Sequence, residues 1–258
     1  MRAQHAEAEQ RKVADAARAE AQTQEAKAKE QEAEARKQAA IAEAVAKFQT
    51  DMLAAADPKK MLGDKVTVLQ AMQGAVKELD QGSLKDQPLV EARVRNTIGT
   101  TLLELARYDD AEPNLRKSLA ILRVAVPRHP DIAYGLNKLA QLLRAQNKFA
   151  EAESLDREAL KIYRATLPAG HPDHAKALNN LAALLQAQNK LTEAEPLYHE
   201  ALEIWRTAHP AGHPDVAHVL NNLAALLQAQ NKLAEAEPLF REGLEIYRAS
   251  LSPGHPAM

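Results

Sequence analysis

The stretch Leu-Asn-Asn-Leu-Ala-Ala-Leu-Leu-Gln-Ala-Gln-Asn-Lys-Leu occupies residues 178–191 and recurs without a change at residues 220–233. An identical recurrence 42 residues further along the chain indicates similar units that stack on one another. More diverged copies precede it, with matching residue types at Asn137, Leu139, Ala140, Leu143 and Asn147, and before them at Asn96, Ile98, Gly99 and Leu102. Function must therefore be sought on the surface that the stacked units create.

The composition favours helices throughout the chain. Hydrophobic residues make up 46% of the 258 residues and aromatic residues only 3%, so the apolar share is mostly Ala and Leu. Both are strong helix formers, and the chain has only 9 Gly. We therefore predict an all-α fold.

Charge and composition also exclude several classes of function. A formal net charge of −2 gives no overall attraction to nucleic acid or anionic lipid, and the absence of Cys removes thiolate metal sites and cysteine nucleophiles. No apolar run approaches the roughly 18 residues of a membrane span, and no signal peptide is visible. We expect no nucleic-acid partner, no membrane insertion and a cytoplasmic location.

Residues 1–56 consist almost wholly of Ala, Glu, Gln, Lys and Arg, without Gly or Pro. They predict one unbroken helix on the order of 80 Å long. Larger apolar residues recur at coiled-coil-like spacing only near its end, at Ile41, Val45, Phe48 and Met52. We favour a solvated helical stalk, with a dimeric coiled coil as the alternative.

Residues 57–87 are predicted to form a linker and an N-terminal capping helix. Asp57-Pro58 ends the stalk, because the residue before a proline is disfavoured in the α region. A second helix is expected to begin after Thr67 as its N-cap. It would pack one apolar face on the array through Leu69, Met72, Val76 and Leu79.

Residues 88–256 contain four helix pairs. The motif Ala-Glu-(Pro/Ser) marks the second helix of each pair, at Ala111, Ala152, Ala194 and Ala236. Pro172 and Pro214 suit a first helical turn, and we place the last pair at residues 214–230 and 234–248. The predicted units are residues 88–128, 129–170, 171–212 and 213–256.

Each unit resembles a tetratricopeptide repeat. The last unit carries the family's small and large residues at Leu223, Ala224, Leu227, Ala236, Phe240, Gly243 and Leu244, and the long units with Leu-Asn-Asn-Leu-Ala and His-Pro-Asp resemble the kinesin light chain subtype. The resemblance implies a right-handed α-solenoid of helical hairpins that binds protein segments on its concave side.

Residues 46–125 show a second resemblance, to the segment that leads into the repeats of bacterial membrane-anchored serine/threonine kinases. It rests on Phe48-Gln49-Thr50-Asp51, Asp57-Pro58 and Asn96-Thr97-Ile98-Gly99. The kinase motifs are absent, and the sequence stops two residues into what would be a fifth unit. We therefore expect a fragment of a longer chain, which would be extracytoplasmic if it is such a kinase tail.

The first helix of each unit should line the concave side, where positions spaced 4, 3 and 4 form one stripe. Asn and Gln side chains on this stripe both donate and accept, which suits the backbone of an extended peptide. By resemblance to the light-chain family, Asn180 and Asn222 would hold the peptide, with Asn137, Asn179 and Asn221 beside them. The other candidate residues are Tyr134, Lys138, Gln141, Lys176 and His218.

The local charge of the stripe is positive, so we expect a peptide with acidic residues, bound less well in high salt. The alternative is that these Asn residues only join neighbouring repeats. His171 and His174 invite a metal site, but the recurrence of His before Pro at His129, His171, His213 and His255 favours a structural role at the turn.

No nucleophile and base are placed together, so we predict a non-enzymatic protein without cofactor or metal. Asp156 departs from the repeat pattern, since Leu115, Tyr198 and Phe240 hold the equivalent position. It predicts either a rotated helix or a weak joint in the stack.

Three functions remain open: a scaffold that binds protein segments, the substrate-recruiting or sensory region of a kinase whose catalytic domain lies elsewhere, and a self-associating structural module. Self-association would use the N-terminal helix or the open end of the array.

Overall fold

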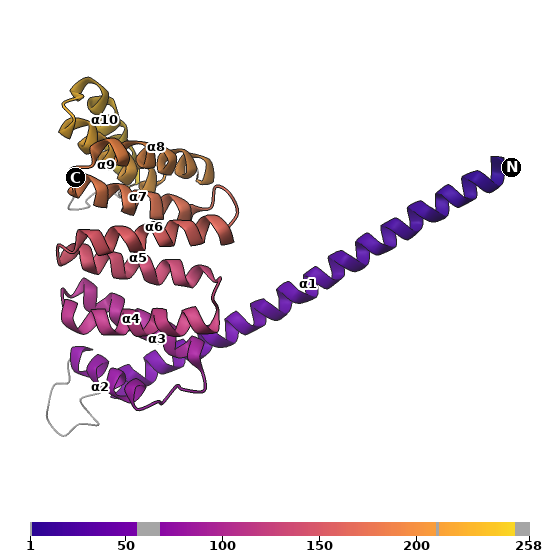
Figure 1. Cartoon of the computed structure of the whole chain (residues 1–258), viewed down its shortest axis with the longest axis horizontal. Coiled ribbons are helices and arrows are strands. Elements are labelled where there is room, and N and C mark those ends of the chain that lie inside the picture. Colours follow the sequence, from indigo (N-terminus) through magenta and orange to yellow (C-terminus); the bar gives the residue numbers. More distant parts are fainter. Residues whose placement is uncertain (1, 56–67, 210–211, 251–258) are drawn as a thin grey trace. The chain divides into compact units, whose positions relative to one another are not determined.

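The computed structural model describes the backbone of residues 2–55, 68–209 and 212–250, and the side chains of residues 17–50, 68–209 and 212–250. These residues form ten helices and no strand, as the predicted all-α fold requires. The chain divides into two compact units, residues 1–77 and 78–258 (Figure 1). Among the described helices, none combines the length and the hydropathy that a bilayer span needs.

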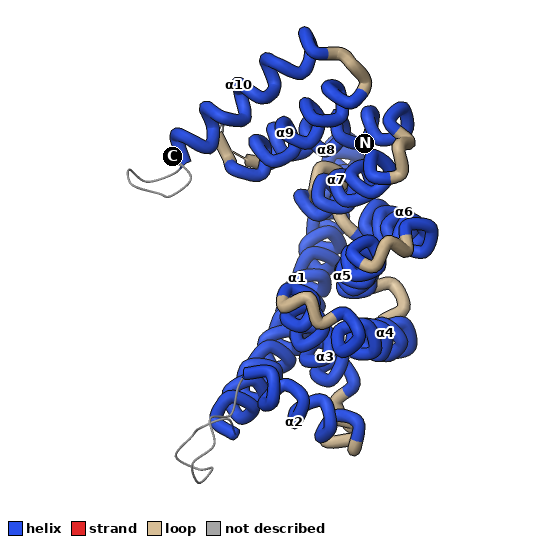
Figure 2. The backbone as a smooth tube through the Cα atoms, turned by 90° about the vertical axis from the view of Figure 1, so that its left-hand side faces the viewer, coloured by secondary structure: helices blue, strands red, loops and turns tan. Residues whose placement is uncertain are grey.

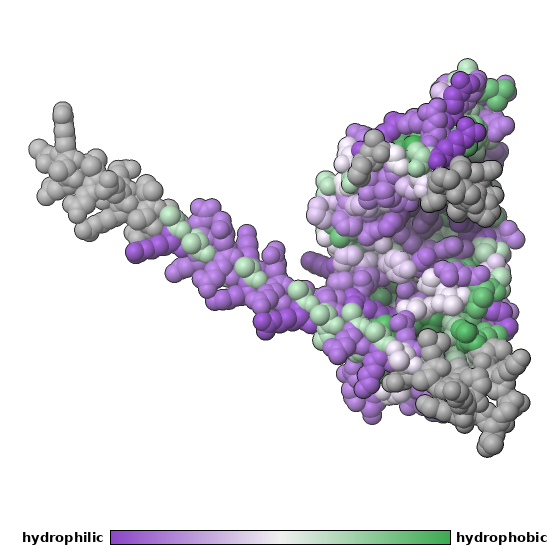
Figure 3. All heavy atoms as spheres, turned by 180° about the vertical axis from the view of Figure 1, so that it is seen from behind, coloured by the Kyte–Doolittle hydropathy of each residue, from purple (hydrophilic) through white to green (hydrophobic). Residues whose placement is uncertain are grey.

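The long N-terminal helix is present as α1, Arg2–Ala55. Residues 17–37 are all exposed, and neighbouring turns are joined by ion pairs such as Lys29–Glu25 and Arg36–Glu32, both at 2.6 Å. Figure 3 shows this surface as mainly hydrophilic with scattered apolar residues. Of the predicted seam, Ile41 is buried and Val45 and Phe48 are half-buried, whereas the side chain of Met52 lies outside the described residues.

Helix α2, Val68–Asp80, agrees with the predicted second helix, although Thr67 lies outside the described residues. Its apolar face is withdrawn from solvent: Met72 and Leu79 are buried, and Leu69 and Val76 are half-buried. Its last three residues, 78–80, belong to the second unit.

The second unit is a stack of four helical hairpins. The pairs are α3 (Pro88–Glu104) with α4 (Tyr108–Ala125), α5 (Pro130–Ala145) with α6 (Phe149–Thr166), α7 (Pro172–Ala187) with α8 (Leu191–Ala208), and α9 (Pro214–Ala229) with α10 (Leu233–Ser250). Each second helix contacts the first helix of the next pair, and consecutive first helices also touch. The first helices α3 and α5 lie on one side of the stack and α4 and α6 on the other (Figure 2).

Leu and Ala fill the space between the hairpins, as the repeat pattern predicts. Leu136, Leu178 and Leu220 hold equivalent positions in three first helices and are fully buried. Fully buried alanines, such as Ala152 and Ala194, allow the helices to approach closely where they cross. Removal of this apolar surface from water is the main force that holds the stack together.

The turn inside each hairpin has one residue in the left-handed conformation, at Ala106, Asn147, Asn189 and Asn231. The turn is a Schellman motif: in the second hairpin Lys148 N–H donates to Leu143 O at 2.8 Å and Asn147 N–H to Arg144 O at 3.0 Å. Asparagine tolerates a positive φ better than alanine does. The recurrent Asn of the repeat therefore has a backbone role at this position.

We expect Ala106→Asn to stabilise the protein by roughly 0.5 kcal/mol, because the Ala106 φ of 55° is unfavourable for alanine. The matched control is Asn189→Ala, which should destabilise by a similar amount. Thermal unfolding measures both changes. A lower melting temperature for Ala106→Asn would contradict the backbone explanation.

Charged side chains join successive second helices at regular positions. Arg123 pairs with Glu158, Arg164 with Glu200, and Arg206 with Glu242, at 2.6 to 2.7 Å. A second series joins the turn within a hairpin to the preceding hairpin, as where Lys190 donates to Glu153 at 2.7 Å. Hydrogen bonds from Lys190, Arg157 and Gln188 lower the pKa of Glu153 to about 2. The Arg–Glu pairs of the first series are about half exposed, so each contributes little to stability.

Candidate functional site

A pocket of about 370 Å³ opens among the first helices of three successive hairpins, α5, α7 and α9. Its polar lining includes seven of the ten residues predicted from the sequence: Asn137, Lys138, Gln141, Lys176, Asn179, Asn180 and His218. Residues that lie 81 positions apart in the chain thus meet around one opening, because the hairpins repeat with a constant spacing. This side of the unit carries the predicted stripe.

The other three predicted residues lie outside the pocket. Tyr134 is 46% exposed, and the Lys138 ammonium lies 5.5 Å from the centre of its ring. Asn221 packs against α10, where its Oδ1 atom lies too close to Gly243 to leave room for a side chain there. Asn222 is half-buried and contacts the preceding hairpin.

Two equivalent amide pairs behave differently in successive hairpins. Asn222 Nδ2 donates to Asn179 Oδ1 at 2.9 Å, so this pair joins α9 to α7. The pair one unit earlier is Asn137 and Asn180, and there the Asn137 Oδ1 atom is buried without a hydrogen-bond partner among the described residues. One pair therefore joins repeats, and the other leaves an acceptor at the pocket.

The pocket also contains residues that were not predicted to bind a ligand. Arg144 lies in the last turn of α5, and Asp215 lies in the first turn of α9. Asp156 and Trp205 come from the second helices α6 and α8. Only first helices entered the predicted stripe, which is why Asp156 and Trp205 were missed. The signal for Asp156 was its departure from the repeat pattern.

Asp156 is a buried carboxyl group at the position of Leu115 and Tyr198. All three side chains are buried, at 4%, 0% and 1% exposure, so α6 is not rotated, in contrast to one expectation from the sequence. Its Oδ1 atom has no partner among the described residues. Burial raises the pKa of Asp156 to about 7, and the Arg144 charge opposes this only in part.

Cations outnumber anions around the pocket. Lys138, Arg144 and Lys176 face it, and the Lys176 ammonium also lies 5.9 Å from the Trp205 ring centre. Asp215 supplies the one acidic group of the lining besides Asp156. The pocket lining thus carries three Lys and Arg side chains and two Asp side chains.

The recurrent histidines cap helices. The Nδ1 atoms of His129, His171 and His213 each accept a hydrogen bond, at 3.2 Å, from the backbone N–H two residues later. Each is followed by a proline at the first helical position, as predicted. A ring nitrogen that accepts this bond satisfies an otherwise free donor of the helix start. His255 lies outside the described residues.

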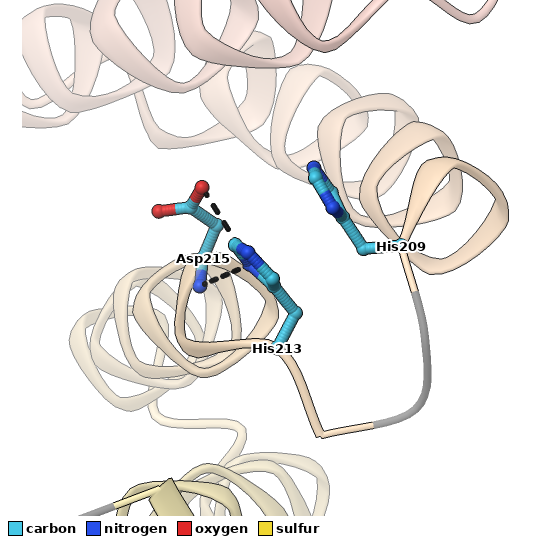
Figure 4. Close-up of side chains that lie close together, drawn as sticks. All are labelled: His209, His213 and Asp215. Carbon is cyan, nitrogen blue, oxygen red and sulfur yellow. Dashed lines mark hydrogen bonds and ion pairs between the residues drawn. The ribbon is translucent and has the colours of Figure 1, made fainter.

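His209, His213 and Asp215 form the one group in the described part of the chain whose ligand atoms are close enough for a metal ion (Figure 4). The two imidazole rings are stacked, with centroids 3.9 Å apart, and Trp205 stacks on His209 at 4.9 Å. Imidazole lone pairs lie in the ring plane, so stacked rings do not direct them to one ion. Helix capping and stacking account for this group.

Comparison with known proteins gives the family. The tetratricopeptide repeat model matches residues 90–165 and 173–249, which is more than half of the chain. A search of curated proteins finds no match.

Three similar solved structures share the fold. A variant of a Podosopora anserina kinesin light chain with nearly identical TPR-like repeats is 20% identical over 71% of this chain and 86% of that chain, with a TM-score of 0.61. BtubC from P. vanneervenii is 20% identical over 84% and 92%, with a TM-score of 0.60. The apo form of RapI is 16% identical over 71% and 64%, with a TM-score of 0.63.

These matches support a protein–protein interaction scaffold, which is the usual, non-catalytic role of this fold. The solved structures are less than 25% identical and show the fold alone, whereas the family model matches the repeats themselves. The chain therefore belongs to the tetratricopeptide repeat family.

Proposed function

We propose that the second unit binds extended peptide segments that carry acidic residues, in the groove lined by α5, α7 and α9. The observation that carries the proposal is the pocket of about 370 Å³, to which α5 and α7 contribute amide and cationic side chains and α9 contributes the opposite wall. A volume of this size accommodates a few residues of a peptide rather than a folded partner.

The amide groups supply the contacts to a peptide backbone. Asn137 Oδ1 is a buried acceptor without a partner among the described residues, so a peptide N–H would satisfy it. Asn180 lines the same pocket and can both donate and accept. Contacts of this kind hold an extended chain without selecting its side chains.

The cationic groups supply the preference for acidic residues. Lys138, Arg144 and Lys176 lie around one opening, which favours carboxylate side chains and disfavours Lys or Arg in the same place. The attraction should weaken as salt rises, because the Debye length falls from about 10 Å at 0.1 M to about 3 Å at 1 M.

The double variant Asn180→Ala with Asn222→Ala is expected to weaken binding of acidic peptides at least tenfold. Peptide arrays would first find binders of the full chain, and fluorescence anisotropy would then give their affinities. Asn222→Ala alone is the matched control, because Asn222 bonds to Asn179 but does not itself line the pocket. Binding that is unchanged in the double variant would place the peptide elsewhere.

A further inference from the structure

The floor of the pocket differs from the equivalent place in the next hairpin. There Tyr198 is buried, and its hydroxyl group donates to Gln186 Oε1 at 3.0 Å. Asp156 and Arg144 hold the same two positions one unit earlier. A neutral, hydrogen-bonded pair is thus replaced by a smaller, ionisable pair that lines the pocket.

No hydrogen bond joins Asp156 to Arg144 in the described structure. Asp156 makes no hydrogen bond or ion pair among the described residues, and Arg144 acts on it only through its charge. A buried carboxyl group without a partner is unfavourable, so its presence at a pocket points to a ligand group that completes it.

The charges that surround the pocket decide whether that ligand group is an anion or a cation. On the helices packed against α6, the pocket is faced by Lys138 and Arg144 of α5 and by Lys176 of α7. Across the opening, α9 contributes Asp215 and His218. The remaining titratable groups, Asp131 and Tyr134 of α5 and Asp173 and His174 of α7, stand nearer the helix starts and do not line the pocket. A cationic ligand would meet three like charges and the opposite charge of Asp215, whereas a carboxylate would meet three opposite charges and the like charge of Asp215.

We propose that the pocket receives a carboxylate side chain of the bound peptide, held by the Arg144 charge and by a hydrogen bond donated from the protonated Asp156 carboxyl group. The inference rests on the proposed function and adds its specificity-determining residue. Two carboxyl groups that share one proton form a strong, short hydrogen bond, and the second negative charge is avoided. Peptide binding then includes uptake of a proton.

The raised pKa of Asp156, about 7, gives the direction of the pH dependence. A bound carboxylate favours the protonated form of Asp156, so affinity is greatest below this pKa and falls as pH rises above it. With one proton taken up, we expect binding to be about tenfold weaker at pH 8 than at pH 6.

The test is titration calorimetry of the full chain with an acetylated, amidated peptide of alternating Ser and Glu. The same peptide with Gln in place of Glu is the control for charge. Because the imidazole of His218 also lines the pocket, all proteins carry His218→Gln. Titrations at pH 6 and pH 8, in buffers of different ionisation enthalpy, measure affinity and proton uptake together.

We expect the protein with Asp156 to take up close to one proton per peptide bound at pH 8. Asp156→Asn keeps a donor without a titrating group, so its binding should not depend on pH and should match, at pH 8, the affinity that Asp156 gives at pH 6. Proton uptake or pH dependence that persists in Asp156→Asn would overturn the inference. If the double variant Asn180→Ala with Asn222→Ala still weakens binding in that case, the groove binds peptides without the proposed role of Asp156. If the Glu peptide does not bind at all, both the proposed function and the role of Asp156 are wrong.

Discussion

Arg95→Ala is expected to destabilise the first repeat by about 3 to 5 kcal/mol, because it leaves a partly buried carboxylate without its partner. The Arg95 side chain is only 3% exposed, and its Nε atom donates to Glu91 Oε1 at 2.7 Å. Its Nη2 atom donates to Asp80 Oδ1 at 2.9 Å. Asp80 would remain paired with Lys117, so the unpaired group in the variant is Glu91, which is 15% exposed.

The repeat pattern supplies the matched control for this change. Glu91 and Arg95 hold the positions of Ile132 and Leu136 in the second hairpin, and of Val216 and Leu220 in the fourth. Replacing a buried ion pair by apolar residues that fit the site is often neutral or stabilising. Glu91→Val with Arg95→Leu should therefore recover most of the stability that Arg95→Ala loses.

Hydrogen exchange measured helix by helix separates this local effect from a general one. Repeats are stabilised mainly by their neighbours, so the exchange of α3 and α4 should accelerate while that of α9 and α10 changes little. Lys117→Ala, at a side chain that is 50% exposed, should cost less than about 1 kcal/mol. Equal stability of Arg95→Ala and the apolar double variant would show that the ion pair is not responsible.

The helical hairpins could be predicted because each unit repeats its local signals. Pro172 and Pro214 begin first helices as expected, and the small and large residues recur at positions that put them between hairpins. The same comparison between units flagged Asp156. Comparison at the position of Leu136 would also have revealed Arg95, since no other unit has a charged residue there.

The detailed site could not be predicted, because it depends on contacts between units rather than within one. Asn179 and Asn222 form a hydrogen bond, but the equivalent Asn137 and Asn180 do not, and the sequence treats the two pairs alike. Small differences in the approach of neighbouring hairpins decide such bonds. The contribution of Trp205 to the pocket likewise depends on how α8 packs against α7 and α9.

Asp156→Asn is expected to stabilise the protein above pH 7 by up to roughly 4 kcal/mol, because burial raises the pKa of Asp156 from 3.8 to about 7. The unfolded chain releases this proton near pH 4, whereas the folded protein keeps it until about pH 7. The stability contributed by the neutral carboxyl group is therefore complete below pH 4 and is lost as pH rises to 7. The amide of the Asp156→Asn variant does not ionise, so its contribution to stability does not change with pH. The stabilities of the two proteins should therefore differ little at pH 4 and most at pH 8.

The double variant Asp156→Tyr with Arg144→Gln extends the same reasoning to packing. It recreates the Tyr198–Gln186 pair in the second hairpin, where the tyrosine would fill the pocket floor and its hydroxyl group would find an acceptor. We expect a higher melting temperature at pH 8, and Asp156→Tyr alone should gain less because Arg144 cannot accept that bond. Melting curves from pH 4 to 8 test both variants beside Asp156→Asn. A lower melting temperature for all three would mean that the Asp156 carboxylate has a stabilising partner in solution.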